Sequence, residues 1–411
     1  MEVNIICITS YRLSCRQISK NFRLSLLYFD FTGAADPVVF LVIFLYESRI
    51  VRQRVLHSST VKIERKYLNA AKSSFSKGII VSVITNICIT NPGRWDNYDY
   101  YFFNCYYRFL ATGESYRSLA FQFRIHHSWI SVIVRQTLNA ICERLQKVAI
   151  PEPNEETLKQ TADGYYRRWH FPHCCGSVDG KHIRIICPGN SGSRYFNYKD
   201  FYSIVMLALV DHYYKFLAVD VGSYGKDGDA GIFAKSPLGN NLSKAIKFPP
   251  PGPLPGTQTV LPYVILGDEA FKLTTTLMRP YPHYQAKAET DKAVYNYRHC
   301  LARRTCENAF GILCQYFRIF FTPIAVDPDT TVLIVLAACI VYNFLRDERS
   351  SSSCDETLSD VMDLPRNIQP LPRRKGNADF EAYNVRNQFR KYFCSREGQV
   401  AWQLAHVERV N

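Results

Sequence analysis

The fold class is decided by the stretch FYSIVMLALVDHYYKFLAVDVGS, residues 201–223. Its two apolar runs, 201–210 and 214–221, are separated by the polar triplet DHY, which predicts two strands joined by a turn. The preceding stretch HCCGSVDGKHIRIICP, residues 173–188, also has the character of a strand. Three strand candidates in succession favour the antiparallel start of a sheet.

Downstream of these strands, helical and extended patterns alternate. The stretch GDAGIFAKSPLGNNLSKAI, residues 228–246, is typical of a helix with a break at Pro237. LPYVILGDEAF then predicts a short buried strand at 263–266, and helical spacing follows at about 291–315 and again at 330–346. This order predicts an α/β domain rather than an all-helical one.

Upstream of the strands, the sequence predicts a helix-turn-helix. The first helix is expected at 116–123, the turn at 124–127, and the second helix from Ser128, a good N-cap residue. Apolar residues follow at helical spacing on one face: Ile130, Ile133, Val134, Leu138, Ile141 and Leu145. The opposite face carries Ser131 and Arg135, which would face the DNA major groove. An ordinary helical hairpin with a solvated polar face remains the alternative.

Composition indicates a protein with a real core and a polyanionic partner. Of the 411 residues, 47% are hydrophobic, and Lys plus Arg outnumber Asp plus Glu by 50 to 36, which gives a net charge of +14. This charge favours nucleic acid first and an anionic membrane second. No membrane span is expected, because no apolar run reaches about 18 residues. Fourteen scattered cysteines without a Cys-x-x-Cys pair indicate reduced, mostly buried thiols.

We divide the chain into five parts. Residues 1–99 have no clean period and are a poorly defined region that fits a gene-model artefact, and 100–150 hold the helix-turn-helix. Residues 151–173 are interpreted as a linker, in which the acidic stretch PEPNEET is followed by an amphipathic stretch. Residues 174–346 form the α/β domain, and 347–411 a polar spacer with a basic tail, in which the stretch FEAYNVRNQFRKYFCS has the spacing of a short basic amphipathic helix.

Three carboxylates stand where the α/β pattern could bring them together. Asp179 and Asp268 follow strand-like stretches, and Glu307 lies in a helical one. Converged carboxylates repel each other, so they need a divalent cation, and two Mg²⁺ ions held in this way suit phosphodiester chemistry. Basic residues close in sequence to these acids are candidate phosphate contacts: Lys181, Arg184, Arg303 and Arg304.

Each acid also has a simpler interpretation. Asp179, followed by glycine, could begin a hairpin turn. Asp268 could cap a helix, and Glu307 could be an exposed helical acid. Four further acids compete for the second position: Asp211, Asp220, Asp227 and Asp229. Near the first acid, His170, His173, Cys174 and Cys175 have metal-ligand residue types, but their spacing does not match a zinc framework, so we interpret them as buried structural residues.

Several motifs occur together in an order that resembles a known family. They include GSVDGKHIRI (176–185), LPYVILGDEAF (261–271), LMRPYP (277–282) and NYRHCLARRTCENAFGIL (296–313). Together they are similar to the catalytic domain of the PIF/Harbinger superfamily of DNA transposases, which also occurs in host proteins described as Harbinger transposase-derived nucleases. The stretch 108–134 is similar to the helix-turn-helix that precedes this domain.

The resemblance implies a ribonuclease-H-like mixed sheet with a DDE triad. The matching positions are Asp179, Asp268 and Glu307, which would bind Mg²⁺, with Mn²⁺ as a substitute, and cleave phosphodiester bonds of DNA. It further implies self-association, a Myb/SANT-like partner protein, and a nuclear location, or a cytoplasmic one without that partner. A domesticated DNA-binding protein without catalysis is the alternative, and Trp129 stands where a small polar residue is expected in a recognition helix.

Overall fold

The computed structural model describes residues 24–29, 40–45, 98–226, 248–351, 368–370 and 380–410. The chain divides into two units, Met1–Asp99 and Tyr100–Asn411. In the first unit, β1 (Leu24–Phe29) pairs antiparallel with β2 (Phe40–Leu45). The helix expected at 228–246, together with Asp227 and Asp229, lies outside the described residues.

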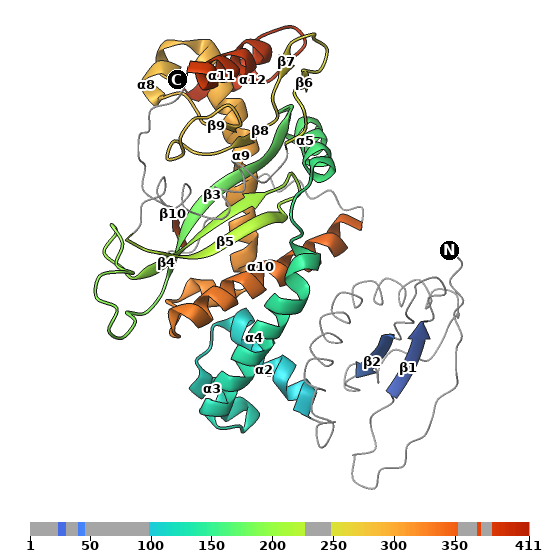
Figure 1. Ribbon diagram of the computed structural model, residues 1–411, viewed down its shortest axis with the longest axis vertical. Coiled ribbons are helices and arrows are strands. Elements are labelled where there is room, and N and C mark those ends of the chain that lie inside the picture. Colours follow the sequence, from blue (N-terminus) through green and yellow to red (C-terminus); the bar gives the residue numbers. More distant parts are fainter. Residues whose placement is uncertain are drawn as a thin grey trace. The chain divides into compact units, whose positions relative to one another are not determined.

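A mixed sheet in the order β5-β4-β3-β8-β9 forms the centre of the second unit (Figure 1). Its strands are β3 (Cys174–Arg184), β4 (Ser203–Val210), β5 (Phe216–Tyr224), β8 (Val264–Leu266) and β9 (Leu277–Met278). The first three are antiparallel, whereas β8 runs parallel to β3 and β9 parallel to β8. This is the ribonuclease-H-like arrangement expected from the sequence, and the short β10 (Ile368–Pro370) pairs with β3 beyond the end of β8.

The central strands follow directly from the sequence pattern. Every residue of β4 is buried, which explains its continuous apolar run, because a strand covered on both faces cannot alternate with polar residues. The predicted turn after β4 is confirmed: Asp211 accepts hydrogen bonds from the backbone N–H groups of Tyr213 and Lys215, at 2.7 and 2.8 Å. In turns of this kind, the Asp carboxylate accepts hydrogen bonds from backbone N–H groups of the turn.

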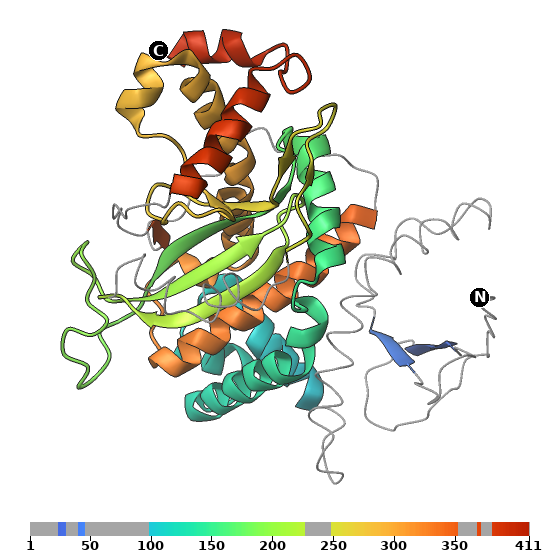
Figure 2. The same cartoon turned by 45° about the horizontal axis from the view of Figure 1, so that its top comes forward.

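Helices cover both faces of the sheet (Figures 1 and 2). The long helix α9 (Thr290–Tyr316) packs on β3, β4 and β8, while α10 (Pro328–Ser351) packs on β5. On the other face, α5 (Glu155–Trp169) packs against β3, and its Leu158 and Ala162 join Val178, Leu207 and Leu209 in one core cluster. The interpretation of 151–173 as a linker is therefore wrong for most of its length, because α5 belongs to the core.

The helical region before the sheet contains α2 (Tyr98–Thr112), α3 (Tyr116–Phe123) and α4 (His127–Ala149). All six predicted apolar residues of the second helix are buried. The predicted N-cap is wrong by two positions: His126 caps α4, and its side chain accepts from the Ser128 N–H. Helix α4 packs against α10, so one side of this region is continuous with the sheet domain.

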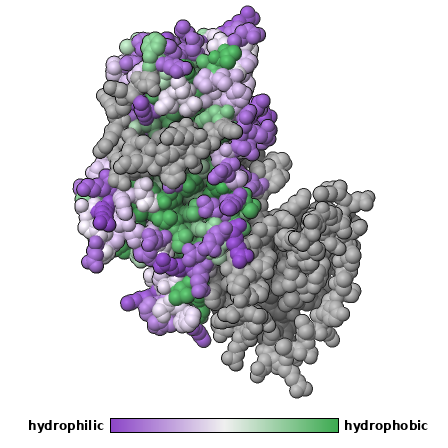
Figure 3. All heavy atoms as spheres, viewed as in Figure 1, coloured by the Kyte–Doolittle hydropathy of each residue, from purple (hydrophilic) through white to green (hydrophobic). Residues whose placement is uncertain are grey.

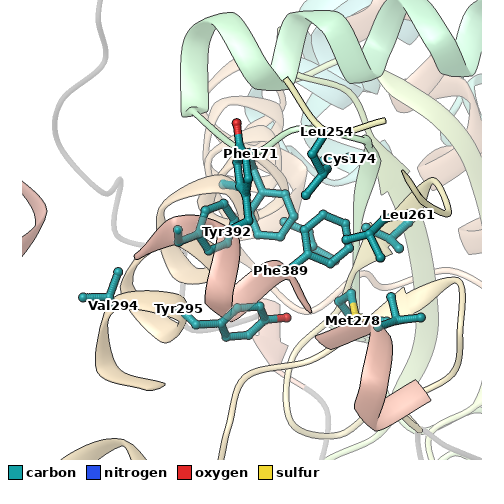
Figure 4. Close-up of a cluster of buried hydrophobic side chains, with 14 of the residues drawn as sticks. Phe171, Cys174, Leu254, Leu261, Met278, Val294, Tyr295, Phe389 and Tyr392 are labelled. Atoms are coloured by element: carbon teal, nitrogen blue, oxygen red, sulfur yellow. The ribbon is translucent and has the colours of Figure 1, made fainter. Parts of the chain in front are cut away.

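The C-terminal residues also contribute to the core. Helices α8 (His283–Ala288), α11 (Phe380–Phe393) and α12 (Gln403–Val410) lie next to α9, and η1 (Arg318–Phe321) follows it. Phe389 and Tyr392 of α11 pack with Phe171 and Tyr295 in the cluster shown in Figure 4. The short pair β6 (Gly252–Pro253) and β7 (Val260–Leu261) borders it. Of the predicted spacer and tail, α11 and α12 are therefore packed parts of the domain.

Helix α10 is apolar enough to cross a membrane by length and composition, with a mean hydropathy of 1.7 over Pro328–Asp347, contrary to the expectation that no segment is. Most of that stretch is buried, because α4 and β5 pack on it. The apolar composition of α10 is thus used in the core.

On the face shown in Figure 3, hydrophobic residues also gather in the middle of this unit, over the β4–β5 region, with hydrophilic residues around them.

Candidate active site

Asp179 lies inside β3 and not at its end. The strand continues through Gly180 to Arg184, so the hairpin interpretation of the Asp-Gly pair is wrong, as is the expectation that the strand stops there. Asp179 pairs in register with Ala208 of the neighbouring strand and is 4% exposed. Its Oδ1 accepts a hydrogen bond from the Gly180 N–H at 2.9 Å. The sheet thereby holds this carboxylate rigidly in the interior.

Asp268 follows β8 and lies on the same side of the sheet as Asp179. Two residues before it, Leu266 is the cross-strand partner of Ser177, and alternate residues of a strand share a face. Its Oδ1 accepts from the Ala270 N–H at 2.9 Å, which holds the turn after the strand. Burial first, and then the charge of Asp179, raise the pKa of the Asp268 carboxyl above its ordinary value. Two of the predicted acids are therefore brought together.

Glu307 projects from α9, the helix that packs on this face. Its Oε1 lies 2.6 Å from Nη2 of Arg303, one helical turn earlier. The same guanidinium has its Nη1 at 4.0 Å from Oδ2 of Asp179. Burial alone would lower the pKa of Arg303, but the charges of Asp179, Glu307 and Asp268 raise it above its ordinary value. Glu307 and Asp179 thus share one arginine, and the charge of Asp268 adds to the electrostatic surroundings of this guanidinium.

Lys181 supplies a second cation to this centre. It stands two residues after Asp179 on the same face of β3, and its Nζ lies 2.7 Å from Oδ2 of Asp179 and 5.6 Å from the ring centre of Phe310. Burial alone would lower its pKa, but Asp179 and then Glu307 raise it. Lys181 is 3% exposed. It therefore pairs with a carboxylate and is not positioned to contact a DNA phosphate, contrary to the prediction.

A hydroxyl network fixes α9 to β3 beside these acids, and sequence reasoning missed it. The hydroxyl of Thr305, two residues before Glu307, lies 2.6 Å from both Ser177 Oγ and Tyr165 OH. Tyr165 OH also donates to the Val210 carbonyl at 3.0 Å. Ser177 could have been found by stepping two residues back from Asp179 along the strand face. The network holds Asp179 and Glu307 in a fixed relation through their own elements.

Two competing acids are excluded by position. Asp220 pairs with Leu207, which pairs with Gly180, so Asp220 lies on the face opposite to that of Asp179. Asp211 is used in the β4–β5 turn. Among the described residues, the resemblance and the geometry select the same second acid, Asp268.

The remaining predicted contacts lie outside this centre. Arg184, at the exposed end of β3, lies over the Phe201 ring at 5.3 Å, and Arg304 is half-buried on α9. On α4, Ser131 is half-buried, and the exposed Arg135 lies 4.0 Å from Asp327. Trp129 is 60% exposed on the same helix. None of these side chains joins the acidic centre.

The carboxylate oxygens of this centre are chemically suited to a divalent cation. In the structure, however, Asp179 and Glu307 are paired with the protein's own cations, Lys181 and Arg303. Oδ2 of Asp179 is buried without a hydrogen bond, since the Lys181 ammonium is close but not aligned with it. An oxygen of this kind, with Asp268 beside it, suits a hard cation. Within the part of the chain that the structure describes, however, no three His, Cys, Asp or Glu side chains are grouped closely enough to hold a metal ion, and His173, Cys174 and Cys175 are simply buried.

Comparison with known families gives one match that covers this centre. Residues 178–343 match the family model described as DDE superfamily endonuclease, and this range contains Asp179, Asp268 and Glu307. No curated protein and no solved structure matches the chain. The match supports a DDE transposase-like nuclease, a class that generally uses divalent metal ions.

Proposed function

We propose that this chain is a metal-dependent DNA endonuclease derived from a transposase of the PIF/Harbinger type. The observation that supports it most is the contact of one arginine with Asp179 of the sheet and Glu307 of α9, with Asp268 on the same side of the sheet, inside the range that matches the endonuclease family. Asp179, Asp268 and Glu307 would be the metal ligands, and Mg²⁺, with Mn²⁺ as a substitute, the cation. The net charge of +14 and the exposed Arg135 are consistent with a DNA substrate.

The roles of the protein's own residues follow from their positions. A divalent cation at these carboxylates would activate the attacking water or 3′-hydroxyl and stabilise the leaving oxygen. The sheet fixes Asp179, and the Thr305 hydroxyl network fixes α9 relative to it. Asp268 binds a cation in its ionised form, which burial of the carboxyl disfavours. Glu307 must exchange its contact with Arg303 for the cation.

The test is cleavage of DNA by the purified full-length chain. We expect nicking of supercoiled plasmid, and cutting of duplexes with terminal inverted repeats, in Mg²⁺ or Mn²⁺ but not in EDTA. Asp179→Ala should abolish it, because the other two acids cannot hold the cation alone. Asp163→Asn, an exposed acid on α5, serves as the control and should cleave normally. Cleavage that persists in Asp179→Ala contradicts the assignment.

A second candidate is a DNA-binding protein without catalysis. It is favoured by the two cations that pair with Asp179 and Glu307 and by the lack of a metal-holding group within the described residues. It predicts salt-dependent DNA binding with no nicking in any divalent metal. In either case we propose a nuclear location, self-association and a Myb/SANT-like partner, as the resemblance implies. The cleavage assay, run beside a DNA-binding assay, separates the two candidates.

A further inference from the structure

We propose that Arg303 positions Glu307 in the metal-free protein and competes with the divalent cation for the carboxylates of the acidic centre. In the metal-free protein its guanidinium would substitute for the cation by holding Glu307 and facing Asp179, and metal binding would require it to leave. This inference rests on the proposed function, since it assumes that the three acids bind a metal.

The contacts of Arg303 place it between the acids. Its Nη2 is 2.6 Å from Glu307 Oε1 and its Nη1 is 4.0 Å from Asp179 Oδ2, so one planar group spans a helix and a strand. A guanidinium presents several donors in one plane and matches carboxylates well. While it stays there, Glu307 is directed to Arg303, which agrees with the lack of a metal-holding group among the described residues.

The balance of charge also favours exchange over coexistence. Asp179 and Glu307 pair with Lys181 and Arg303, and Asp268, whose pKa the charge of Asp179 raises, brings one further negative charge to a largely buried site. A single divalent cation would make the centre positive, and a second would add further repulsion between cations at short range. If Arg303 turns away, the repulsion between the protein's own cations and the divalent cation falls, even before DNA binds.

Arg303 is better placed to leave than Lys181. The Lys181 side chain is 4% exposed and lies near the Phe310 ring, whereas that of Arg303 is 16% exposed. A long side chain that already reaches solvent can turn outward without leaving a charge stranded in the core. Lys181 would then remain as the permanent partner of Asp179.

The experiment measures Mn²⁺ binding to the intact chain without DNA, by isothermal titration calorimetry. Arg303→Gln should bind Mn²⁺ about tenfold or more tightly than the wild type, which is the lower end of measured couplings between close charge pairs. Arg303→Lys, which keeps the positive charge but not the planar guanidinium, should bind Mn²⁺ less tightly than Arg303→Gln. Arg304→Gln removes the same charge from the next position of α9 and should leave the affinity unchanged.

A second readout guards against misfolding. In EDTA, the thermal midpoint of Arg303→Gln should fall, because Glu307 and Asp179 lose a cation, and Mn²⁺ should raise it by more than it raises that of the wild type. Adding Glu307→Gln should remove the gain in affinity. Equal Mn²⁺ affinities of the wild type and Arg303→Gln overturn the inference and leave the proposed function standing. If no variant, including the wild type, binds Mn²⁺, the proposed metal centre itself fails.

Discussion

Buried carboxylates in this domain are stabilised by two different means. Asp179 faces the cations of Lys181 and Arg303, whereas Asp211 is held by two backbone N–H groups in the β4–β5 turn. The first arrangement leaves a buried oxygen, Oδ2 of Asp179, without a hydrogen bond, whereas Asp211 has no buried oxygen of this kind. A carboxylate that a turn already satisfies has little to offer a ligand, so the difference separates a structural acid from a candidate functional one.

The titration of Asp211 gives a prediction at the scale of the residue. Burial raises its pKa to about 6, and the two N–H donors offset this only partly. The folded state therefore holds this proton more tightly than the unfolded chain, whose carboxyl titrates near 3.8. Stability from this group is present at low pH, is lost as the pH rises to about 6, and stays reduced above it.

Asp211→Asn should keep the turn and lose this penalty. We expect it to raise the free energy of unfolding at pH 7 by up to about 3 kcal/mol, with little effect at pH 4. Urea denaturation at both pH values measures the difference. Asp163→Asn, on the exposed side of α5, should show no such dependence. Parallel changes at both pH values would contradict the account of Asp211.

The acidic centre was only partly predictable at this scale. Period-two spacing from Asp179 places Lys181 and Ser177 on its face, so their proximity was available from the sequence. The pairing of Arg303 with Glu307 is also implied by their spacing of four on a helix. The burial of Lys181 could not be predicted from the sequence. It depends on the packing of α9 on β3, and α9 begins more than 100 residues later in the chain. The basic residues were consequently assigned to DNA phosphates and not to the acids.

Among the elements, α10 shows how an apolar helix is oriented within the core. It is buried against α4 on one side and β5 on another, so most of its surface is apolar. Asn343 provides its main polar contact: its Oδ1 accepts from the Phe216 N–H at 2.9 Å, and its Nδ2 donates to the carbonyls of Phe216 and Ala149. One amide thus connects the sheet, α10 and the end of α4.

Removing this amide should destabilise the domain strongly. Asn343→Leu would remove the side-chain partner of one backbone N–H and two backbone carbonyls, so we expect a loss of about 2–4 kcal/mol in the free energy of unfolding. Gln136→Leu, at an exposed position of α4, should change it by less than about 0.5 kcal/mol. Urea denaturation of both variants tests the difference, and an equal, small effect would rule out a special role for Asn343.

Helices and strands with a clear hydrophobic periodicity were predictable, whereas short strands that are recognised only by their hydrogen-bonded neighbours were not. Strands β3–β5 and helices α4, α9 and α10 follow from apolar runs and helical spacing. The two- and three-residue strands β6, β7, β9 and β10 carry no pattern, because only their hydrogen-bonded partners define them. The amphipathic stretch that forms helix α5 is recognisable in the sequence, but its acidic, proline-punctuated start led to its interpretation as a linker, although the same acids suit a helix N-terminus.

At the scale of the molecule, the excess of 14 positive charges is a property of the whole chain. The two cations of the acidic centre are not available to DNA while they are paired, so DNA attraction must come from the others. Arg135 and Arg184 are exposed members of that group. Such an excess attracts a polyanion without regard to its sequence and responds to salt.

DNA affinity should therefore fall steeply with salt. If six or more phosphates are contacted, the affinity should drop by about 10³ or more between 50 and 200 mM salt. Arg135→Ala should lower the slope of log affinity against log salt by about one. Lys215→Ala should leave the slope unchanged, because Lys215 is less exposed than Arg135 and is held by Asp347 at 2.5 Å, against 4.0 Å between Arg135 and Asp327. Fluorescence anisotropy with a labelled duplex provides the measurement, and an affinity independent of salt would exclude DNA as the partner of this charge.

The central claim is that Asp179, Asp268 and Glu307, far apart in sequence, hold one metal centre. It is tested most directly by replacing the cation with Fe²⁺ and adding ascorbate and peroxide, so that radicals formed at the bound iron cut the nearby backbone. The account predicts cuts near 179, 268 and 307 together, lost in excess Mg²⁺ and in Asp179→Asn. Cuts confined to another place, such as the His170–Cys175 stretch, or no specific cuts at all, would contradict it.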